Sequence, residues 1–229
     1  MIEKKRRKLK IGFYIFAIIS GIIIGVVCAL NNVPDPVFNR VLVAYVVIFV
    51  AIWVFIDFKY MKRMAEEVNA LLPILYDEED PRKYLEKLTE LLGGAKSRAL
   101  RTVFCINSAV AYCDMDDYET AKSQLHALDP QKLRARYRLI YELNDALISM
   151  HLGEVEKTME IWNAGKEAFL AIGLSENFGP SVASLRIFAM IYEGREEDAK
   201  REIDVARARY PRPRNQKAFD FLEKLLENR

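Results

Sequence analysis

Histidine and cysteine are scarce in this chain, which limits the chemistry available to it. Its 229 residues include two histidines and three cysteines. Neither His126 nor His151 is accompanied by cysteines or paired carboxylates at the spacing of metal ligands or of an acid–base pair. Glycine-rich phosphate loops, the zinc motif HExxH and the hydrolase motif GxSxG are also missing. We therefore expect no metal, no cofactor and no enzymatic activity.

The cysteines form no disulfide framework. Cys28 lies in an apolar run, far along the chain from the other two. Cys105 and Cys113 are about two turns apart on one predicted helix, which is too far for a bridge within it. Unpaired thiols of this kind usually fill apolar space in a reducing compartment, and we expect that role here.

Excess charge is lacking as well. The chain has 34 basic and 32 acidic residues, a formal net charge of +2. So small a surplus gives no bulk attraction to nucleic acid, and we expect no nucleic-acid partner. Two local basic clusters, residues 132–138 and 207–217, either face solvent or attract anionic headgroups or an acidic partner; a solvated face is the favoured interpretation.

Ionisable side chains are missing altogether between residues 11 and 30. At about 1.5 Å per residue, a helix of that length crosses the roughly 30 Å hydrocarbon core of a bilayer. A basic start before an apolar run also fits a cleaved signal peptide. We disfavour that interpretation because the run is long, no Ala-x-Ala site follows, and a second apolar segment comes soon after. The sequence predicts a transmembrane helix over about 11–30.

A second apolar segment follows a short polar loop. Two prolines within residues 31–39 end the first helix, and residues 41–56 are again uncharged. If Arg40 reaches the interface with its long side chain, the segment attains membrane length over about 38–58. We expect residues 1–58 to form a basic N-terminus and a two-helix transmembrane hairpin integral to the lipid, and residues 59–229 to form a separate domain.

The distribution of basic residues predicts the orientation of this hairpin. The N-terminus is strongly basic, the loop carries only Arg40, and the second segment is followed by Lys59, Lys62 and Arg63. By the positive-inside rule, the N-terminus and residues 59–229 lie in the cytoplasm of a cell-membrane protein with two spans. The short basic start and compact hairpin are typical of a bacterial protein.

Small residues recur on one face of the first segment. Ala17, Gly21, Gly25 and Ala29 are spaced by four positions, which lets another helix approach closely. Packing against the second segment of the same chain is the favoured interpretation. The alternative is homo-oligomerisation through this helix, or docking onto another membrane protein.

Beyond residue 58 a helix–turn–helix pattern repeats. Residues 107–114 and 118–128 form two short amphipathic helices around a polar turn at Asp116, with a stop at Pro130. Similar turns occur at Glu79, Gly153 and Gly194, so the steps are 37, 37 and 41 residues by subtraction of residue numbers. Periods of this size built from helix pairs are typical of an α-solenoid.

Several residues recur at equivalent places in these units. They are small residues on the first helix (Ala109, Ala146), an aromatic one turn later (Tyr112), turn glycines (Gly153, Gly194), alanines on the second helix (Ala121, Ala199), large apolar residues (Leu125, Trp162, Ile203) and terminal prolines (Pro130, Pro211). The pattern resembles the tetratricopeptide repeat (TPR) family, with departures at Tyr84, Thr158 and Ile187. The resemblance implies an all-α fold with a TPR-like solenoid of about 3.5 to 4 helix pairs.

The two ends of this region have features of their own. Residues 59–75 are expected to continue the second membrane helix and to bend near Pro73. After the second basic cluster, Asn215 can cap a closing helix that reaches Arg229. Its expected apolar face consists of Ala218, Phe219, Leu222, Leu225 and Leu226. An open stack of helix pairs needs such a closing helix.

In TPR proteins the first helices of the pairs line a groove that binds peptides. Carrying that register across this chain places Asn69, Asn107, Val110, Asp114, Asn144, Leu147, His151, Phe188 and Tyr192 in the groove. Asn107 and Asn144 fall at equivalent positions and suit hydrogen bonding to an extended peptide. The basic residues with which some TPR proteins clamp a terminal carboxylate are missing at these positions. For the apolar members, filling the core is an equally good interpretation.

We therefore predict a membrane-anchored TPR-like scaffold that binds a protein or peptide partner at the cytoplasmic face of the membrane. Tethering to the membrane raises the effective concentration of such a partner. The main alternative is an accessory or regulatory subunit of a larger integral membrane complex, such as a transporter or protease, contacted through the hairpin. The two functions can be distinguished by mutation. Substitutions on the small-residue face would disrupt the membrane complex of the alternative, whereas substitutions in the groove would disrupt partner binding by the scaffold.

Overall fold

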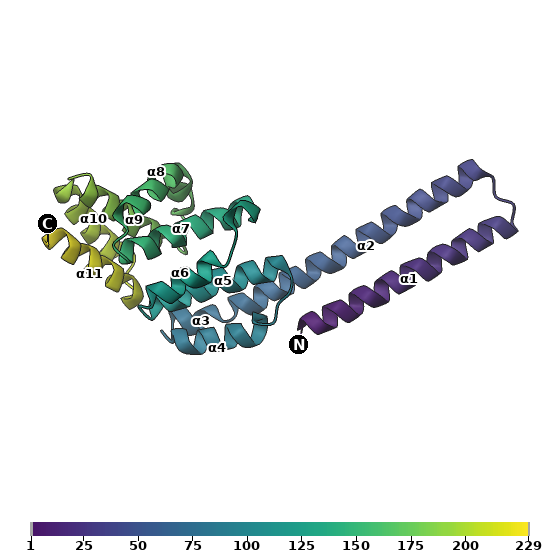
Figure 1. Cartoon of the computed structure of the whole chain (residues 1–229), viewed down its shortest axis with the longest axis horizontal. Helices are drawn as coiled ribbons and strands as arrows, with labels where there is room; N and C mark the ends of the chain where they lie inside the picture. Colours follow the sequence, from purple (N-terminus) through teal and green to yellow (C-terminus); the bar gives the residue numbers. More distant parts are fainter. Residues whose placement is uncertain (1, 229) are drawn as a thin grey trace. The chain divides into compact units, whose positions relative to one another are not determined.

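The computed structural model describes residues 2–228, which form α-helices, one 3-10 turn and no strand (Figure 1). The predicted all-α class is confirmed. Internal contacts divide the chain into two units, of which the first ends at Leu71 and the second begins at Leu72. The sequence prediction places the boundary between residues 58 and 59, at the expected end of the second membrane segment. The unit boundary lies further along because helix α2 continues without interruption to Asn69.

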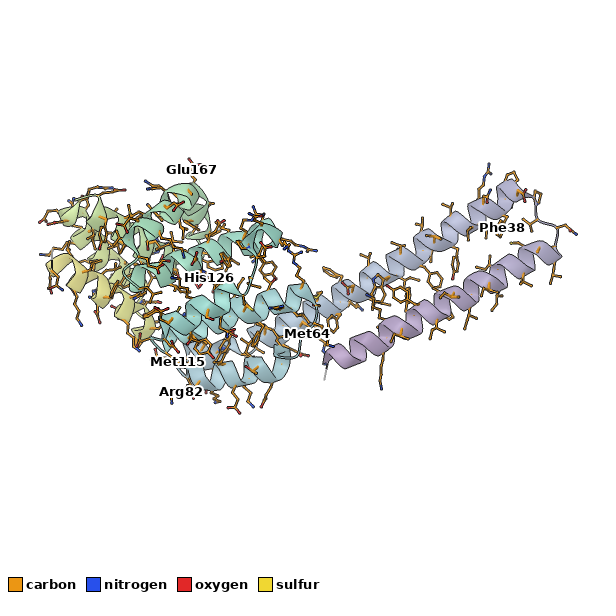
Figure 2. The ribbon with its side chains drawn as sticks, in the orientation of Figure 1. Phe38, Met64, Arg82, Met115, His126 and Glu167 are labelled. Carbon is orange, nitrogen blue, oxygen red and sulfur yellow. The ribbon has the colours of Figure 1, made fainter. Side chains whose placement is uncertain are left out.

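The first unit is a helical hairpin. Helix α1 spans Ile2–Leu30 and helix α2 spans Asp35–Asn69, and they run side by side in opposite directions (Figure 1). The turn between them is shorter than the expected loop of residues 31–39. Helix α2 begins at Asp35 because Pro36 falls in its first turn, where the missing N–H would have no helical acceptor. Figure 2 shows Phe38 on this early part of α2.

Tyr45 joins the two helices of the hairpin. Its hydroxyl lies 2.7 Å from Oγ of Ser20 and donates to the carbonyl of Ala17. A Cβ added at Gly21 would lie 3.6 Å from the Tyr45 ring, which is ordinary van der Waals contact. Ala17 and Gly21 of the small-residue face thus lie next to Tyr45 of α2. A side chain at Gly25 would meet no atom within 4 Å.

The outward faces of the hairpin are apolar. Exposed large apolar side chains crowd α1 and α2 from Leu9 to Phe58, whereas beyond Phe58, among residues up to 228, only Leu170, Leu174 and Val205 are of this kind. Both helices are long and apolar enough to cross a membrane. In each helix, the most apolar stretch has no residue buried inside the protein. A core helix of a water-soluble domain would be mostly buried, so that interpretation does not fit.

The second unit consists of consecutive helices that pack against their neighbours in sequence. They are α3 (Leu72–Tyr76), α4 (Pro81–Leu92), α5 (Arg98–Asp114), α6 (Tyr118–His126), η1 (Pro130–Lys132), α7 (Ala135–His151), α8 (Val155–Ile172), α9 (Gly179–Tyr192), α10 (Glu196–Arg209) and α11 (Pro213–Glu227). α7 also packs against α5 and α9. The helix expected over residues 59–75 is interrupted between Asn69 and Leu72, next to Pro73.

The turns inside the helix pairs share one backbone conformation. Glu79, Asp116, Gly153 and Gly194 have positive φ values of 53°, 59°, 74° and 75°. These are the turn positions that the sequence period selects, and each ends one helix in the left-handed conformation. In two of the turns an aspartate then caps the next helix: Asp80 accepts from the Lys83 N–H at 2.9 Å, and Asp117 accepts from the Thr120 N–H at 3.1 Å.

Alanines in the second unit allow its helices to approach closely. The small residues that recur in the repeat, Ala109, Ala121, Ala146 and Ala199, are all 0% exposed. Large side chains fill the space around them, and the most deeply buried include Trp162, Phe169 and Leu125. One cluster of buried residues joins α7 to α11, and another joins α5, α6 and α7.

Asp145 on α7 is a buried acidic residue, and side chains from two neighbouring helices contact it. Its Oδ1 accepts from Nζ of Lys157 on α8 at 2.8 Å and lies 2.9 Å from Nε2 of His126 on α6. The side chain of Asp145 is only 11% exposed, so an unpaired carboxylate here would be costly. His126 is thus a structural partner of Asp145.

We predict that Leu125→Ala lowers the free energy of unfolding of the second unit by about 2–5 kcal/mol, because Leu125 is 0% exposed and its removal leaves a cavity. Urea unfolding in detergent micelles measures this, with Trp162 as the only fluorophore of its kind after Trp53→Phe. Leu170→Ala is the matched control, since Leu170 is 38% exposed on α8. Equal losses from both substitutions would contradict the assigned core.

Candidate partner-binding groove

Most of the predicted groove residues lie on three neighbouring helices. α5 carries Asn107, Val110 and Asp114; α7 carries Asn144, Leu147 and His151; α9 carries Phe188 and Tyr192. Because α7 packs against both α5 and α9, these side chains lie on one row of adjacent helices. Asn69 is different, since it is the exposed last residue of α2 and belongs to the first unit.

The C-terminal helix α11 contacts this row of helices along its length. It packs against α9 and α10, and Figure 1 shows it extending from there toward α5 and α6. Near its start, Arg214 Nε donates to Oδ1 of Asp114 on α5 at 2.6 Å. About two turns later, the ring of Phe221 lies 4.4 Å from the ring of His151 on α7. Part of the predicted groove is therefore occupied by the chain itself.

Arg214 is held by an aromatic ring as well as by a carboxylate. Its guanidinium carbon lies 4.8 Å from the ring centroid of Tyr76, the last residue of α3. The side chains of Arg214 and Asp114 are 30% and 15% exposed. Arg214 on α11 thus contacts Tyr76 on α3, the first helix of the second unit. Its other partner, Asp114, lies 100 residues earlier in the chain, so this is also a tertiary contact.

The carboxylate side of this pair is incompletely satisfied. Among the residues described, Oδ2 of Asp114 is buried without a hydrogen-bond partner. Burial raises the pKa of the Asp114 carboxyl, although Arg214 acts in the opposite direction. Burial alone would lower the pKa of Arg214, but Asp114 and Tyr76 raise it by more, so the guanidinium stays charged. The site therefore binds the Arg214 guanidinium through Oδ1 of Asp114, while Oδ2 accepts no hydrogen bond from the described residues.

His151 lies between two aromatic rings. Tyr118 stacks on it at 4.3 Å with an angle of 8° between the rings, and Phe221 lies on α11 at 4.4 Å. Burial lowers the pKa of His151 to about 4, against a smaller opposing effect of Asp116. His151 is therefore neutral at neutral pH and acts as a packing residue between α6, α7 and α11.

The apolar members of the predicted groove contribute to the core. Phe188 is 1% exposed and its ring lies 4.6 Å from that of Tyr192. Leu147 and Tyr192 are half-buried in the same cluster as Phe221 of α11. Phe188 offers no surface to a partner in this structure, because neighbouring side chains cover it completely.

The two predicted asparagines bond mainly within the protein. Asn107 accepts from the Tyr84 hydroxyl at 3.0 Å and donates to the carbonyl of Val103 at 2.8 Å. Asn144 donates to the carbonyl of Ile140 at 2.7 Å. Both side chains and Val110 are half-buried. The part of the groove away from α11 thus keeps partly exposed polar groups, of which Asn144 is the less engaged.

Other surface features show little chemical specialisation. A shallow depression between α4 and α5 is lined by Arg82, Leu85, Glu86, Thr89, Glu90, Tyr112 and Met115, with Arg82 and Met115 at the same end of the unit in Figure 2. Burial raises the pKa of Cys113 to about 12, so its thiol is protonated at neutral pH. Within the described part of the chain, no group of three or more metal-ligand side chains comes together.

The residues that decide how this site is filled were not among those selected from the sequence. Tyr76, Tyr118, Arg214 and Phe221 make the contacts around Asp114 and His151. Arg214 appeared only as a member of a basic cluster. The predicted cap Asn215 lies inside α11, which begins at Pro213, with Arg212 in the cap position. Phe221 follows Arg214 at helical spacing, which was an available signal for a second face on this helix.

Comparison with family models, with curated proteins and with solved structures found no match for this chain. The resemblance to TPR proteins therefore stays a prediction based on the residues quoted for it.

We predict that His151→Phe makes the stability of the protein less dependent on pH. The folded pKa of about 4 lies below the ordinary value of 6.5, so the unfolded chain binds more protons between these values. Stability contributed by neutral His151 is present above pH 6.5 and is lost as pH falls toward 4, by about 3 kcal/mol in total.

Urea unfolding of the wild type and of His151→Phe at several pH values between 7.5 and 4.5 measures this effect. Their difference in unfolding free energy should shift in favour of the variant as the pH falls, since other titrating groups are common to both. A difference that stays constant over that range would contradict a buried neutral His151.

Proposed function

We propose that this protein is a membrane-anchored TPR-like scaffold that binds a protein or peptide partner at the cytoplasmic face of the membrane. The observation that carries the proposal is the contrast between the two units. The hairpin has an apolar surface that needs lipid, whereas the second unit has a polar surface and a row of adjacent helices. The protein acts by binding and not by catalysis.

The hairpin supports the membrane anchor in two ways. Its outward side chains are apolar over a length that suits a bilayer. Near one end, Lys10 lies 5.5 Å from the centroid of the Trp53 ring and 5.8 Å from that of Tyr14. Such a cluster of cation and aromatic rings is typical of a membrane interface. Lys59 and Lys62 follow on α2, which favours a cytoplasmic location for this end.

The recurring turn supports the TPR-like solenoid. Glu79, Asp116, Gly153 and Gly194 adopt the same left-handed conformation at steps of 37, 37 and 41 residues. In each helix pair after the first, a completely buried alanine lies at the contact between helices. An array built in this way presents the first helices of its pairs, α5, α7 and α9, in one row. The partner binds along this row in our proposal.

The alternative function, an accessory subunit of a membrane complex, is favoured by one feature of the hairpin. Gly25 belongs to the face that begins at Ala17, yet the space where its side chain would project is empty within 4 Å. Ala29 is exposed on the same face. Small residues that leave room on a membrane helix suit close contact with another helix, either of a second copy or of a different protein.

We predict that residues 31–34 face the outside and that α10 faces the cytoplasm. In a variant with Cys28, Cys105 and Cys113 changed to alanine, a cysteine introduced by Asn31→Cys should react with a membrane-impermeant maleimide in intact cells. One introduced by Lys200→Cys should react only after lysis. The reverse pattern would overturn the orientation, and labelling of both in intact cells would overturn the hairpin.

We predict that substitutions in the groove and not in the hairpin release the partner. Full-length Asn144→Arg should lose partners captured by crosslinking in membranes and identified by mass spectrometry, because the added side chain blocks the open part of the row. Asn163→Arg is the matched control, since Asn163 is exposed on α8. Circular dichroism verifies that both variants fold.

The same capture tests the alternative function. Gly25→Leu fills the empty space on α1, and Val27→Leu, on an exposed position of α1, is its control. If Gly25→Leu removes the partners and Asn144→Arg retains them, the hairpin makes the specific contact and the scaffold proposal fails.

A further inference from the structure

Helix α11 presents two faces to the rest of the second unit. Phe219 and Leu222 are 0% exposed and belong to the cluster that contains the buried residues of α9 and α10. Arg214 and Phe221 point instead to α5 and α7, where they contact Asp114 and His151. The first face ends the series of helix pairs. The second face borders the first, since Phe221 also packs against that cluster, and it lies on residues of the predicted groove.

The contacts of the second face have the character of ligand recognition. A guanidinium is bound by a carboxylate at 2.6 Å and by the face of Tyr76 at 4.8 Å. An aromatic ring about two turns away packs on the neutral imidazole of His151. A helix with a cation in its first turn and an aromatic residue at i+7 satisfies both subsites, because these positions share one helix face.

Arg214 does not use the whole of the Asp114 subsite. Its Nε binds Oδ1, while Oδ2 is buried and, among the described residues, has no partner. Arginine can bind both oxygens of a carboxylate at once, and such paired bonds are among the strongest in proteins. An external arginine placed to donate to both oxygens therefore has an advantage over Arg214, which offsets part of the advantage that α11 has from being in the same chain.

We infer that α11 is an internal ligand of the groove and that the partner is an amphipathic helix with the same recognition face, a cation in its first turn and an aromatic residue at i+7. This inference rests on the proposed function and names both the partner class and its regulation. The partner helix competes with α11 for Asp114, Tyr76 and His151. Occupancy by α11 lowers the apparent affinity, which equals the intrinsic affinity multiplied by the fraction of time that the site is free.

The test uses full-length protein in lipid nanodiscs and a fluorescent peptide with the sequence of residues 211–229. Binding is measured by fluorescence anisotropy. Wild-type protein should bind the peptide weakly, because its own α11 fills the site. Arg214→Ala combined with Phe221→Ala in the protein removes the competing face but keeps Phe219 and Leu222, and it should raise peptide affinity by about tenfold or more.

Three controls locate the effect. Adding Asp114→Ala to the double variant should abolish the gain, and a peptide carrying the same two alanines should not bind. Lys224→Ala, at an exposed position of α11, should leave the affinity unchanged. Arg214→Gln is milder than the double variant and should give a smaller gain if the double variant does not fold by circular dichroism.

Two results would overturn the inference. One is a folded double variant, or a folded Arg214→Gln variant, that binds the peptide no better than the wild type. The other is a gain in affinity that survives Asp114→Ala. Both leave the proposed function standing if Asn144→Arg still releases the captured partner. Conversely, loss of partners from Gly25→Leu alone would refute the scaffold while the peptide result stands.

Discussion

The second unit depends on the burial of an apolar stripe that no single helix pair can cover. The alanines at the helix contacts are completely buried, and large side chains such as Trp162 and Phe169 fill the space around them. In the solenoid that we propose, each pair leaves one stripe for its neighbour, so the series requires an ending. α11 supplies it by burying Phe219 and Leu222. Without this helix, the last pair would expose apolar surface to water.

The same helix introduces a charge into a largely buried region. Burying Asp114 would be costly if it stood alone, and Arg214 from α11 neutralises it. Tyr76 adds an aromatic face, so the contact joins the first and last helices of the unit. One helix therefore serves both to end the series and to fill the row of helices that we propose as the binding surface. The two properties are coupled because they lie on bordering faces of one helix, where Phe221 packs against the same apolar cluster as Phe219 and Leu222.

The hairpin shows the opposite distribution of apolar and polar side chains. Its apolar side chains point outward, and the polar groups of Ser20 and Tyr45 are paired between the helices. Pairing of polar groups inside a hairpin is favourable in lipid, where no water is available to bond them. In our proposal the hairpin anchors the second unit to the membrane, and this tethering raises the local concentration of a partner.

The sequence by itself determined the helical class, the apolar hairpin and the places of the turns. These features depend on local patterns: uncharged length for residues 11–30, and helical spacing around Asp116, Gly153 and Gly194. The starts of α2 and α11 differ from the prediction, because a proline in the first turn allows a helix to begin earlier than a loop-forming proline suggests. The helix expected over residues 59–75 differs as well, since it is interrupted between Asn69 and Leu72.

Tertiary structure alone decided what each groove residue touches. Phe188 and Leu147 lie at equivalent distances before the turn glycines Gly194 and Gly153, yet Phe188 is buried and Leu147 is half-buried, because their neighbours in the tertiary structure differ. The partners of Asp114 and His151 come from residues about 100 and 70 positions later in the chain. Helical periodicity identifies which residues share a face, but it carries no information about which distant helix will pack against that face.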